Sequence, residues 1–213
     1  MNPRFFAAND AGAVVPASPP GPDAPPLATF RDINLFQQGA PALAAAAPPA
    51  APAIIVWSGT PADSLFERSP LAWTSDAWQR LASLSAEAAA ACAAAGRTLV
   101  LRPHTAHVLS DVQRCVRWLN ESARPAGAGL VLDPLSLLTP DMLPAAEDHL
   151  RRIFETLAGE ARALWLAEIP QSPALRDLLT AAAARWTPPE LPVIAPLADI
   201  PHWQRALAAP ASR

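Results

Sequence analysis

The chain has 213 residues, of which 51% are hydrophobic and 16% are charged, and its formal net charge at pH 7 is −3. This length is sufficient for a full hydrophobic core in one domain. The weak negative charge and the lack of a basic stripe argue against nucleic acid or an anionic membrane surface as a partner. No apolar run approaches the roughly 20 residues of a transmembrane helix or forms a signal peptide, so a cytoplasmic protein is expected.

The N-terminal part of the chain differs in composition from the rest. Alanine, proline, glycine and aspartate dominate residues 1–27, which predicts a disordered arm without a packed core. Residues 28–213 are predicted to form a single α/β barrel-like domain. Within it, residues 29–36 alternate weakly, as a short strand would, and residues 40–53 read as an alanine/proline linker.

After this linker, one sequence pattern repeats along the chain. A short apolar run ends in one or two polar residues, and an amphipathic helical pattern then follows. Strands that are buried on both faces of a parallel sheet read as continuous apolar runs of this kind. The five runs are residues 54–58, 99–104, 130–134, 163–168 and 192–196.

Between these runs, the sequence contains residues that are typical of helix N-termini. Asp76 and Ser110 are each followed three residues later by glutamine, as in a capping box. A further helix begins near Pro201, and Cys92 and Cys115 are expected to be small buried side chains on helices. Two other helices are predicted where an N-cap residue directly precedes proline, at Thr139-Pro140 and Ser172-Pro173.

Regular alternation of strands and helices predicts an α/β fold with a parallel sheet. The number of units favours a five-stranded doubly wound sheet, because a complete TIM barrel has eight units. The residues that make up three of the strand segments favour a barrel instead. Three segments read LVLRPH (99–104), GLVLDPLSLL (129–138) and ALWLAEIP (163–170).

These three segments resemble strands of the sugar phosphate isomerase/epimerase family, the xylose isomerase-like TIM barrels. The resemblance implies a shortened or incomplete TIM barrel with a degenerate metal site. Asp133 matches the metal-binding aspartate of the family. Arg102 stands where the family has a metal-binding glutamate, and Ser136 stands where it has a histidine. Glu168 falls near the polar end of the third strand.

Polar residues at the carboxyl ends of the strands are the candidate site, because parallel α/β folds carry their chemistry there. Arg102 could bind a carboxylate or phosphate, or pair with Asp133 on the neighbouring strand. His104, together with His107 in the same loop, could transfer a proton near neutral pH. Asp133 and Glu168 could be site carboxylates or could simply end their strands.

Two main hypotheses follow from these residues. The first is an isomerase/epimerase that transfers a proton next to a carbonyl of a small sugar derivative, with Arg102, His104, Asp133 and Glu168 as its catalytic residues. The second is a non-catalytic binding or interaction module on the same fold. A third reading is a flavodoxin-like sheet with an anion site at residues 58–60.

No cofactor is expected, although the protein is expected to bind a small molecule. A divalent metal, if bound, would take Asp133, Glu168 and His104 as ligands. It is disfavoured because the Arg102 guanidinium would lie close to the ion. At about 4 Å and an effective dielectric constant of 20, that charge would repel a divalent ion by roughly 8 kcal/mol.

Overall fold

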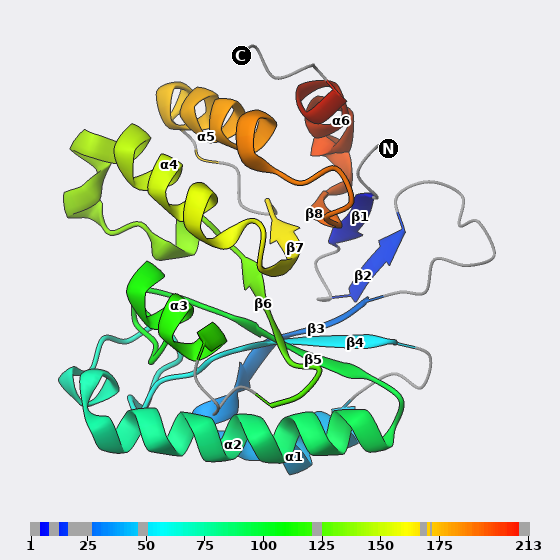
Figure 1. The fold of residues 1–213 in the computed structure, drawn as a ribbon, viewed down its shortest axis with the longest axis vertical. Coiled ribbons are helices and arrows are strands. Elements are labelled where there is room, and N and C mark those ends of the chain that lie inside the picture. Colours follow the sequence, from blue (N-terminus) through cyan, green and yellow to red (C-terminus); the bar gives the residue numbers. More distant parts are fainter. Residues whose placement is uncertain are drawn as a thin grey trace.

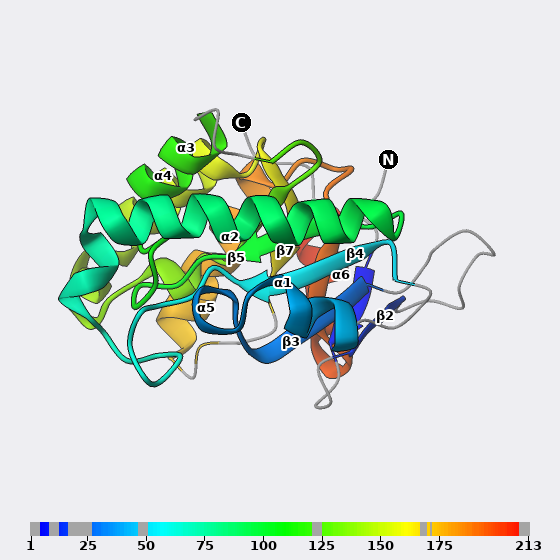
Figure 2. The ribbon, with the colours of Figure 1, turned by 90° about the horizontal axis from the view of Figure 1, so that it is seen from below.

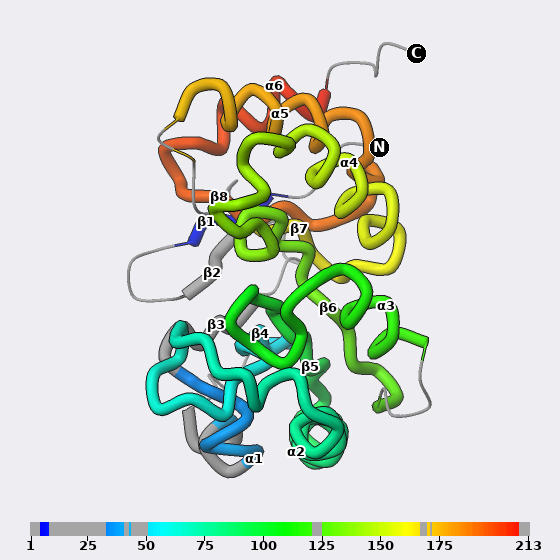
Figure 3. The backbone as a smooth tube through the Cα atoms, turned by 90° about the vertical axis from the view of Figure 1, so that its left-hand side faces the viewer, coloured from blue at the N-terminus to red at the C-terminus, as the bar shows by residue number. Residues whose placement is uncertain are grey.

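The computed structural model describes residues 5–8, 13–16, 27–46, 51–120, 125–166, 170 and 172–208. Its strands form a closed barrel in which each strand pairs with its neighbours in chain order and β8 pairs with β1. Figure 3 shows the strands following one another around this barrel. The strands are β1 (Phe5–Ala8), β2 (Ala13–Pro16), β3 (Leu27–Asn34), β4 (Ala53–Trp57), β5 (Thr98–Arg102), β6 (Gly129–Leu132), β7 (Ala161–Trp165) and β8 (Val193–Pro196).

The prediction of a shortened TIM barrel is confirmed, and the alternative of a five-stranded doubly wound sheet is wrong. From β3 to β8, and on to β1, every pair of neighbours is parallel. The departure from a regular TIM barrel is β2, which runs antiparallel to both β1 and β3. The first three strands therefore form a meander in place of βαβ units.

Helices surround the barrel. In Figure 1, α1 and α2 lie below the strands and α4, α5 and α6 lie above them. Figure 2 shows α2 beside β5, which it contacts. Among the described residues, no helix is both long and apolar enough to cross a bilayer. The helices are α1 (Leu35–Ala46), α2 (Ser75–Ala94), α3 (Val112–Asn120), α4 (Ala146–Leu157), α5 (Pro173–Trp186) and α6 (Ile200–Ala208).

The prediction that residues 1–27 form a disordered arm is wrong where the structure describes them. β1 and β2 lie within this segment, and β1 pairs in register with β8, with Phe6 opposite Ile194. Each strand has four residues, too short to stand out against the surrounding alanine and proline. Their partners make them strands, because pairing with distant strands satisfies backbone groups that a local pattern does not reveal.

The predicted linker over residues 40–53 is also wrong in part, because α1 continues to Ala46. Gly39 adopts a φ of 65° inside this helix and kinks it. This helix contacts α2 and the preceding barrel strand β3. Helix formation in this alanine-rich segment thus depends on tertiary packing.

The other helices lie where they are predicted, with some changes at their N-termini. Thr74, not Asp76, caps α2 by accepting the N–H of Ala77. Asp111, not Ser110, accepts an N–H at the start of α3. Thr139-Pro140 begins a 3-10 segment, η3 (Pro140–Ala145), and α4 follows it. Cys92 and Cys115 are buried and unpaired, as predicted.

The hydrophobic core has two layers. The larger one lies between the barrel and its helices. The smaller one fills the barrel interior, to which alternate residues of the strands contribute because successive side chains of a strand point to opposite faces. The interior residues are Phe6, Ile55, Val100, Val131, Ala163, Trp165 and Ile194.

Candidate functional site at the carboxyl end of the barrel

Four inward-facing side chains meet at the carboxyl ends of neighbouring strands. Each lies two residues beyond an apolar interior residue, so strand alternation directs it into the barrel. Each is also almost completely buried. The four are Trp57 at the end of β4, Arg102 at the end of β5, Asp133 directly after β6 and Trp165 at the end of β7.

Arg102 and Asp133 form a buried ion pair. The Arg102 Nε atom donates to Asp133 Oδ2 at 2.7 Å, and a terminal guanidinium nitrogen lies 2.5 Å from the same oxygen. The residues are 5% and 3% exposed. The expectation that the two side chains meet across adjacent strands is confirmed. A charge pair this deeply buried is stable only when its remaining polar atoms are also satisfied.

Two tryptophan rings enclose the guanidinium. The Arg102 Cζ atom lies 3.9 Å from the Trp57 ring centroid and 4.2 Å from that of Trp165. A desolvated cation–π contact of this kind contributes about 2 kcal/mol. The rings therefore replace part of the hydration that Arg102 loses inside the barrel. The apolar runs that contain Trp57 and Trp165 predict that both rings are buried, but only the tertiary structure places both rings against the Arg102 guanidinium.

Ser136 donates two further hydrogen bonds to the Asp133 carboxylate. Its N–H donates to Asp133 Oδ1 at 3.2 Å, and its Oγ–H donates to Oδ2 at 2.5 Å. Ser136 lies in the short 3-10 segment η2 (Leu135–Leu137), which turns back over the end of β6. Both oxygens of Asp133 therefore accept hydrogen bonds from the protein itself.

His107 is a buried side chain with a hydrogen-bond partner at each ring nitrogen. Its Nε2 lies 2.8 Å from the Leu65 carbonyl oxygen, which can only accept, so Nε2 carries the proton. Its Nδ1 then accepts from Ser58 Oγ at 3.4 Å. Burial, followed by the neighbouring His104, lowers the pKa of His107 from 6.5 to about 3. The imidazole is neutral at physiological pH.

His104 is more accessible. It is partly buried, its Nδ1 accepts the N–H of Ala106 at 3.1 Å, and Nε2 makes no hydrogen bond within the described part of the chain. Its ring centroid lies 5.0 Å from that of Phe66, a residue that is 52% exposed. Burial lowers the pKa of His104, and the nearby Asp133 partly opposes this. In its neutral form His104 presents an Nε2–H donor at the mouth of the barrel.

Glu168, the fourth predicted site residue, lies outside the described residues. In the loop over residues 58–60, the N–H groups of Ser58 and Thr60 already donate to protein oxygens, so these two amides are not available to the anion of the third hypothesis. The N–H of Thr60 donates to Asn34 Oδ1, and Asn34 Nδ2 donates to the Thr60 carbonyl. Sequence reasoning missed Asn34. A single polar residue at the junction of a strand and a helix is the only sequence signal for it.

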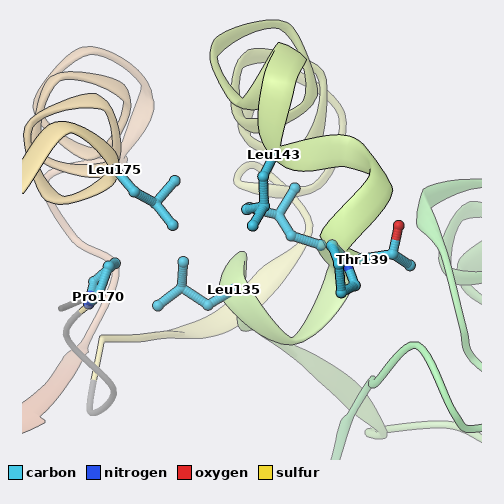
Figure 4. Close-up of a pocket in the computed structure, with 7 residues that line it drawn as sticks. Leu135, Thr139, Leu143, Pro170 and Leu175 are labelled. Carbon is cyan, nitrogen blue, oxygen red and sulfur yellow. The ribbon is translucent and has the colours of Figure 1, made fainter. Parts of the chain in front are cut away.

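An apolar groove lies beside the polar cluster. It has a volume of about 340 Å³ and opens between η2, η3 and the start of α5 (Figure 4). Leu135, two residues beyond Asp133, forms part of its wall, and Leu143 on the opposite wall is 48% exposed. No sequence motif predicts this groove. The lining residues are Leu135, Leu138, Thr139, Pro140, Leu143, Pro170 and Leu175.

The described residues do not fit a metal ion. Within them no group of three histidine, cysteine, aspartate or glutamate side chains converges on one point. Asp133 is buried and accepts hydrogen bonds from Arg102 and Ser136, and the guanidinium lies directly against its Oδ2. A divalent ion requires about three ligands and little competing positive charge. This part of the barrel thus provides neither the three ligands that a divalent ion requires nor surroundings with little positive charge.

The sequence matches no protein-family model and no curated protein. Among solved structures, the xylose isomerase domain protein from Planctomyces limnophilus is similar, with a TM-score of 0.43 and 11% sequence identity. The match covers 74% of this chain and 56% of that protein, so the chain spans little more than half of its length.

Proposed function

We propose that this protein is a non-catalytic binding module on a shortened TIM barrel, and that its ligand is a small molecule held at the carboxyl end. The observation that carries the proposal is that Asp133 is buried and that both of its oxygens accept hydrogen bonds from the protein. An acid–base catalyst or a metal ligand needs an accessible oxygen, whereas both oxygens here are used to hold Arg102 and Ser136 in place.

The apolar groove is a part of this end, formed by described residues, that a ligand can enter. Leucine and proline form six of its seven lining residues, and Thr139 supplies the one side-chain hydroxyl. Its volume of about 340 Å³ is at the lower end of the range of roughly 300–1,000 Å³ for small-molecule pockets. Such a lining binds a sugar derivative with an apolar substituent better than it binds an underivatised sugar phosphate.

Binding can be tested by saturation-transfer NMR with phenyl β-glucoside, glucose and glucose 6-phosphate as probes. We expect transfer to the phenyl ring and little transfer to the two unsubstituted sugars. Leu143→Gln should weaken the phenyl glucoside signal. Leu197→Gln is the matched control, because Leu197 is also exposed, at 66%, but does not line the groove. Equal signals from both variants would remove the groove as the binding site.

An isomerase/epimerase is the second candidate, and the position of His104 favours it. Its Nε2 is at the mouth of the barrel, next to the exposed Phe66 ring. Isotope exchange next to the carbonyl of fructose 6-phosphate in deuterated water, followed by NMR with and without Mn²⁺, separates the candidates. The binding module predicts no exchange. Exchange that His104→Gln abolishes would establish catalysis and overturn the proposal.

A further inference from the structure

A second cavity lies at the opposite end of the barrel. It has a volume of about 290 Å³ and enters the barrel interior from the amino ends of the strands. Ala53 and Thr98 at its rim are the first residues of β4 and β5, whereas Arg102 is the last residue of β5. The cavity is therefore separate from the groove proposed above. Its lining residues are Ala53, Ile55, Thr98, Val100, Gly127, Arg162 and Ala163.

A β-bulge places Arg162 at this cavity. The pairing of β6 with β7 shifts so that Leu130 lies opposite Ala161 but Val131 lies opposite Ala163. Arg162 is the extra residue between these pairs. A bulge breaks the strict alternation of a strand and redirects one side chain. Here it brings an arginine to the mouth of an otherwise apolar cavity.

Gly129 on the neighbouring strand makes room for this arginine. A Cβ atom built at Gly129 would overlap Arg162 Cγ. The arginine stem therefore lies directly across β6 at a position where only glycine leaves space. The bulge in β7 and the glycine in β6 are independent features, and both favour the same position of one cationic side chain.

The charge of Arg162 is not balanced locally. The side chain is exposed, and within the described part of the chain it makes no ion pair and no hydrogen bond. Thr98 adds a partly buried hydroxyl at the same rim, and the walls behind both residues are aliphatic. The cavity thus combines an apolar interior with one positive charge at its entrance.

We infer that this cavity binds a small monocarboxylate with a short alkyl chain. The alkyl chain occupies the space between Ile55, Val100 and Ala163, and the carboxylate pairs with Arg162. The planar guanidinium fork matches a carboxylate with two parallel hydrogen bonds. Since Arg162 is the one charged residue in the lining, a singly charged ligand fits it better than a doubly charged phosphate. The small volume limits the chain to a few carbons.

Calorimetric titration of the full chain with hexanoate tests the inference, and 1-hexanol is the neutral probe of the same chain length. We expect hexanoate to bind and hexanol to bind more weakly. Arg162→Gln should weaken hexanoate binding about tenfold or more, because a hydrogen bond to a charged group is lost. Arg162→Lys should retain part of the affinity. Arg152→Gln is the matched control, since Arg152 is an exposed arginine on α4.

The position of the ligand can be checked by NMR. Hexanoate should shift the amide signals of Gly127 and Gly129, which lie at this end of the barrel. Leu143→Gln, which alters the carboxyl-end groove, should leave hexanoate binding unchanged. The inference is overturned if the wild-type chain does not bind hexanoate at millimolar concentrations, or if Arg162→Gln binds it as tightly as the wild type.

Discussion

The two ends of the barrel each present an arginine, and they treat its charge in opposite ways. At the carboxyl end, Arg102 is 5% exposed, paired with Asp133 and enclosed by Trp57 and Trp165. At the amino end, Arg162 is exposed at the rim of an apolar cavity and has no carboxylate partner within the described residues.

This difference separates a structural charge from a charge that can bind a ligand. Burying Arg102 without a partner would be very unfavourable, and the ion pair with Asp133 provides that partner within the fold. Arg162 remains hydrated, so it can exchange water for a ligand carboxylate. The end at which TIM barrels normally carry their chemistry therefore holds the more deeply buried charge in this protein.

Closure of the barrel supports both ends, and its loss should have the largest effect. A chain that begins at residue 27 lacks β1 and β2, which exposes the edges of β3 and β8 and removes Phe6 from the interior. We expect loss of cooperative thermal unfolding by circular dichroism. Phe6→Leu in the full chain is the control and should unfold cooperatively. A truncated chain as stable as the full one would show that the first two strands are dispensable.

Removing each arginine tests the comparison directly. Arg102→Met leaves Asp133 as a buried carboxylate without its cation and should destabilise the fold by about 3–5 kcal/mol. Arg162→Met should change stability by no more than about 0.5 kcal/mol. Urea unfolding measures both. The double variant Arg102→Met/Asp133→Leu should recover much of the loss. Similar effects at both arginines would refute the distinction.

Protonation of His107 should sharpen the comparison, because this residue rigidifies the carboxyl end alone. Its pKa is lowered to about 3 in the folded chain, chiefly by burial. Between its ordinary pKa of 6.5 and this value, the unfolded chain binds a proton that the folded chain does not. Stability should therefore fall by up to about 1.4 kcal/mol per pH unit as the pH decreases through this range.

His107→Gln should remove about 2 kcal/mol of the difference in stability between pH 7 and pH 5. His149→Gln, a histidine variant on α4, is the control for loss of an imidazole as such. Urea unfolding at the two pH values provides the measurement. An unchanged pH dependence in His107→Gln would mean that other groups govern the acid sensitivity of the fold.

A smaller loss of stability than that of Arg102→Met is expected from a substitution beside Arg162 at the amino end. Gly129→Ala should destabilise the fold by about 1 kcal/mol, because the new methyl group displaces the Arg162 stem. It should also weaken hexanoate binding. Adding Arg162→Ala should restore the stability but not the binding. If Gly129→Ala leaves both quantities unchanged, Gly129 does not position Arg162.

The sequence by itself determined the strands from β4 to β8 and most of the helices. Continuous apolar runs and helix caps are local signals, and here the tertiary structure agrees with them. It also determined that Arg102 and Asp133 meet, because each ends a strand and one crossover helix separates them. Parallel strands joined in this way lie side by side with their carboxyl ends together.

Only the tertiary structure decided the closure of the barrel and the chemical state of each site. β1 is a strand because β8 pairs with it across most of the chain length, and β2 is a strand because it pairs with both β1 and β3. Both oxygens of Asp133 accept hydrogen bonds because Ser136 folds back onto the carboxylate, and Arg162 faces a cavity because the register of β6 and β7 slips by one residue. A local pattern reports which residues prefer burial or a strand, but pairing register and the partners of buried charges depend on contacts between distant segments.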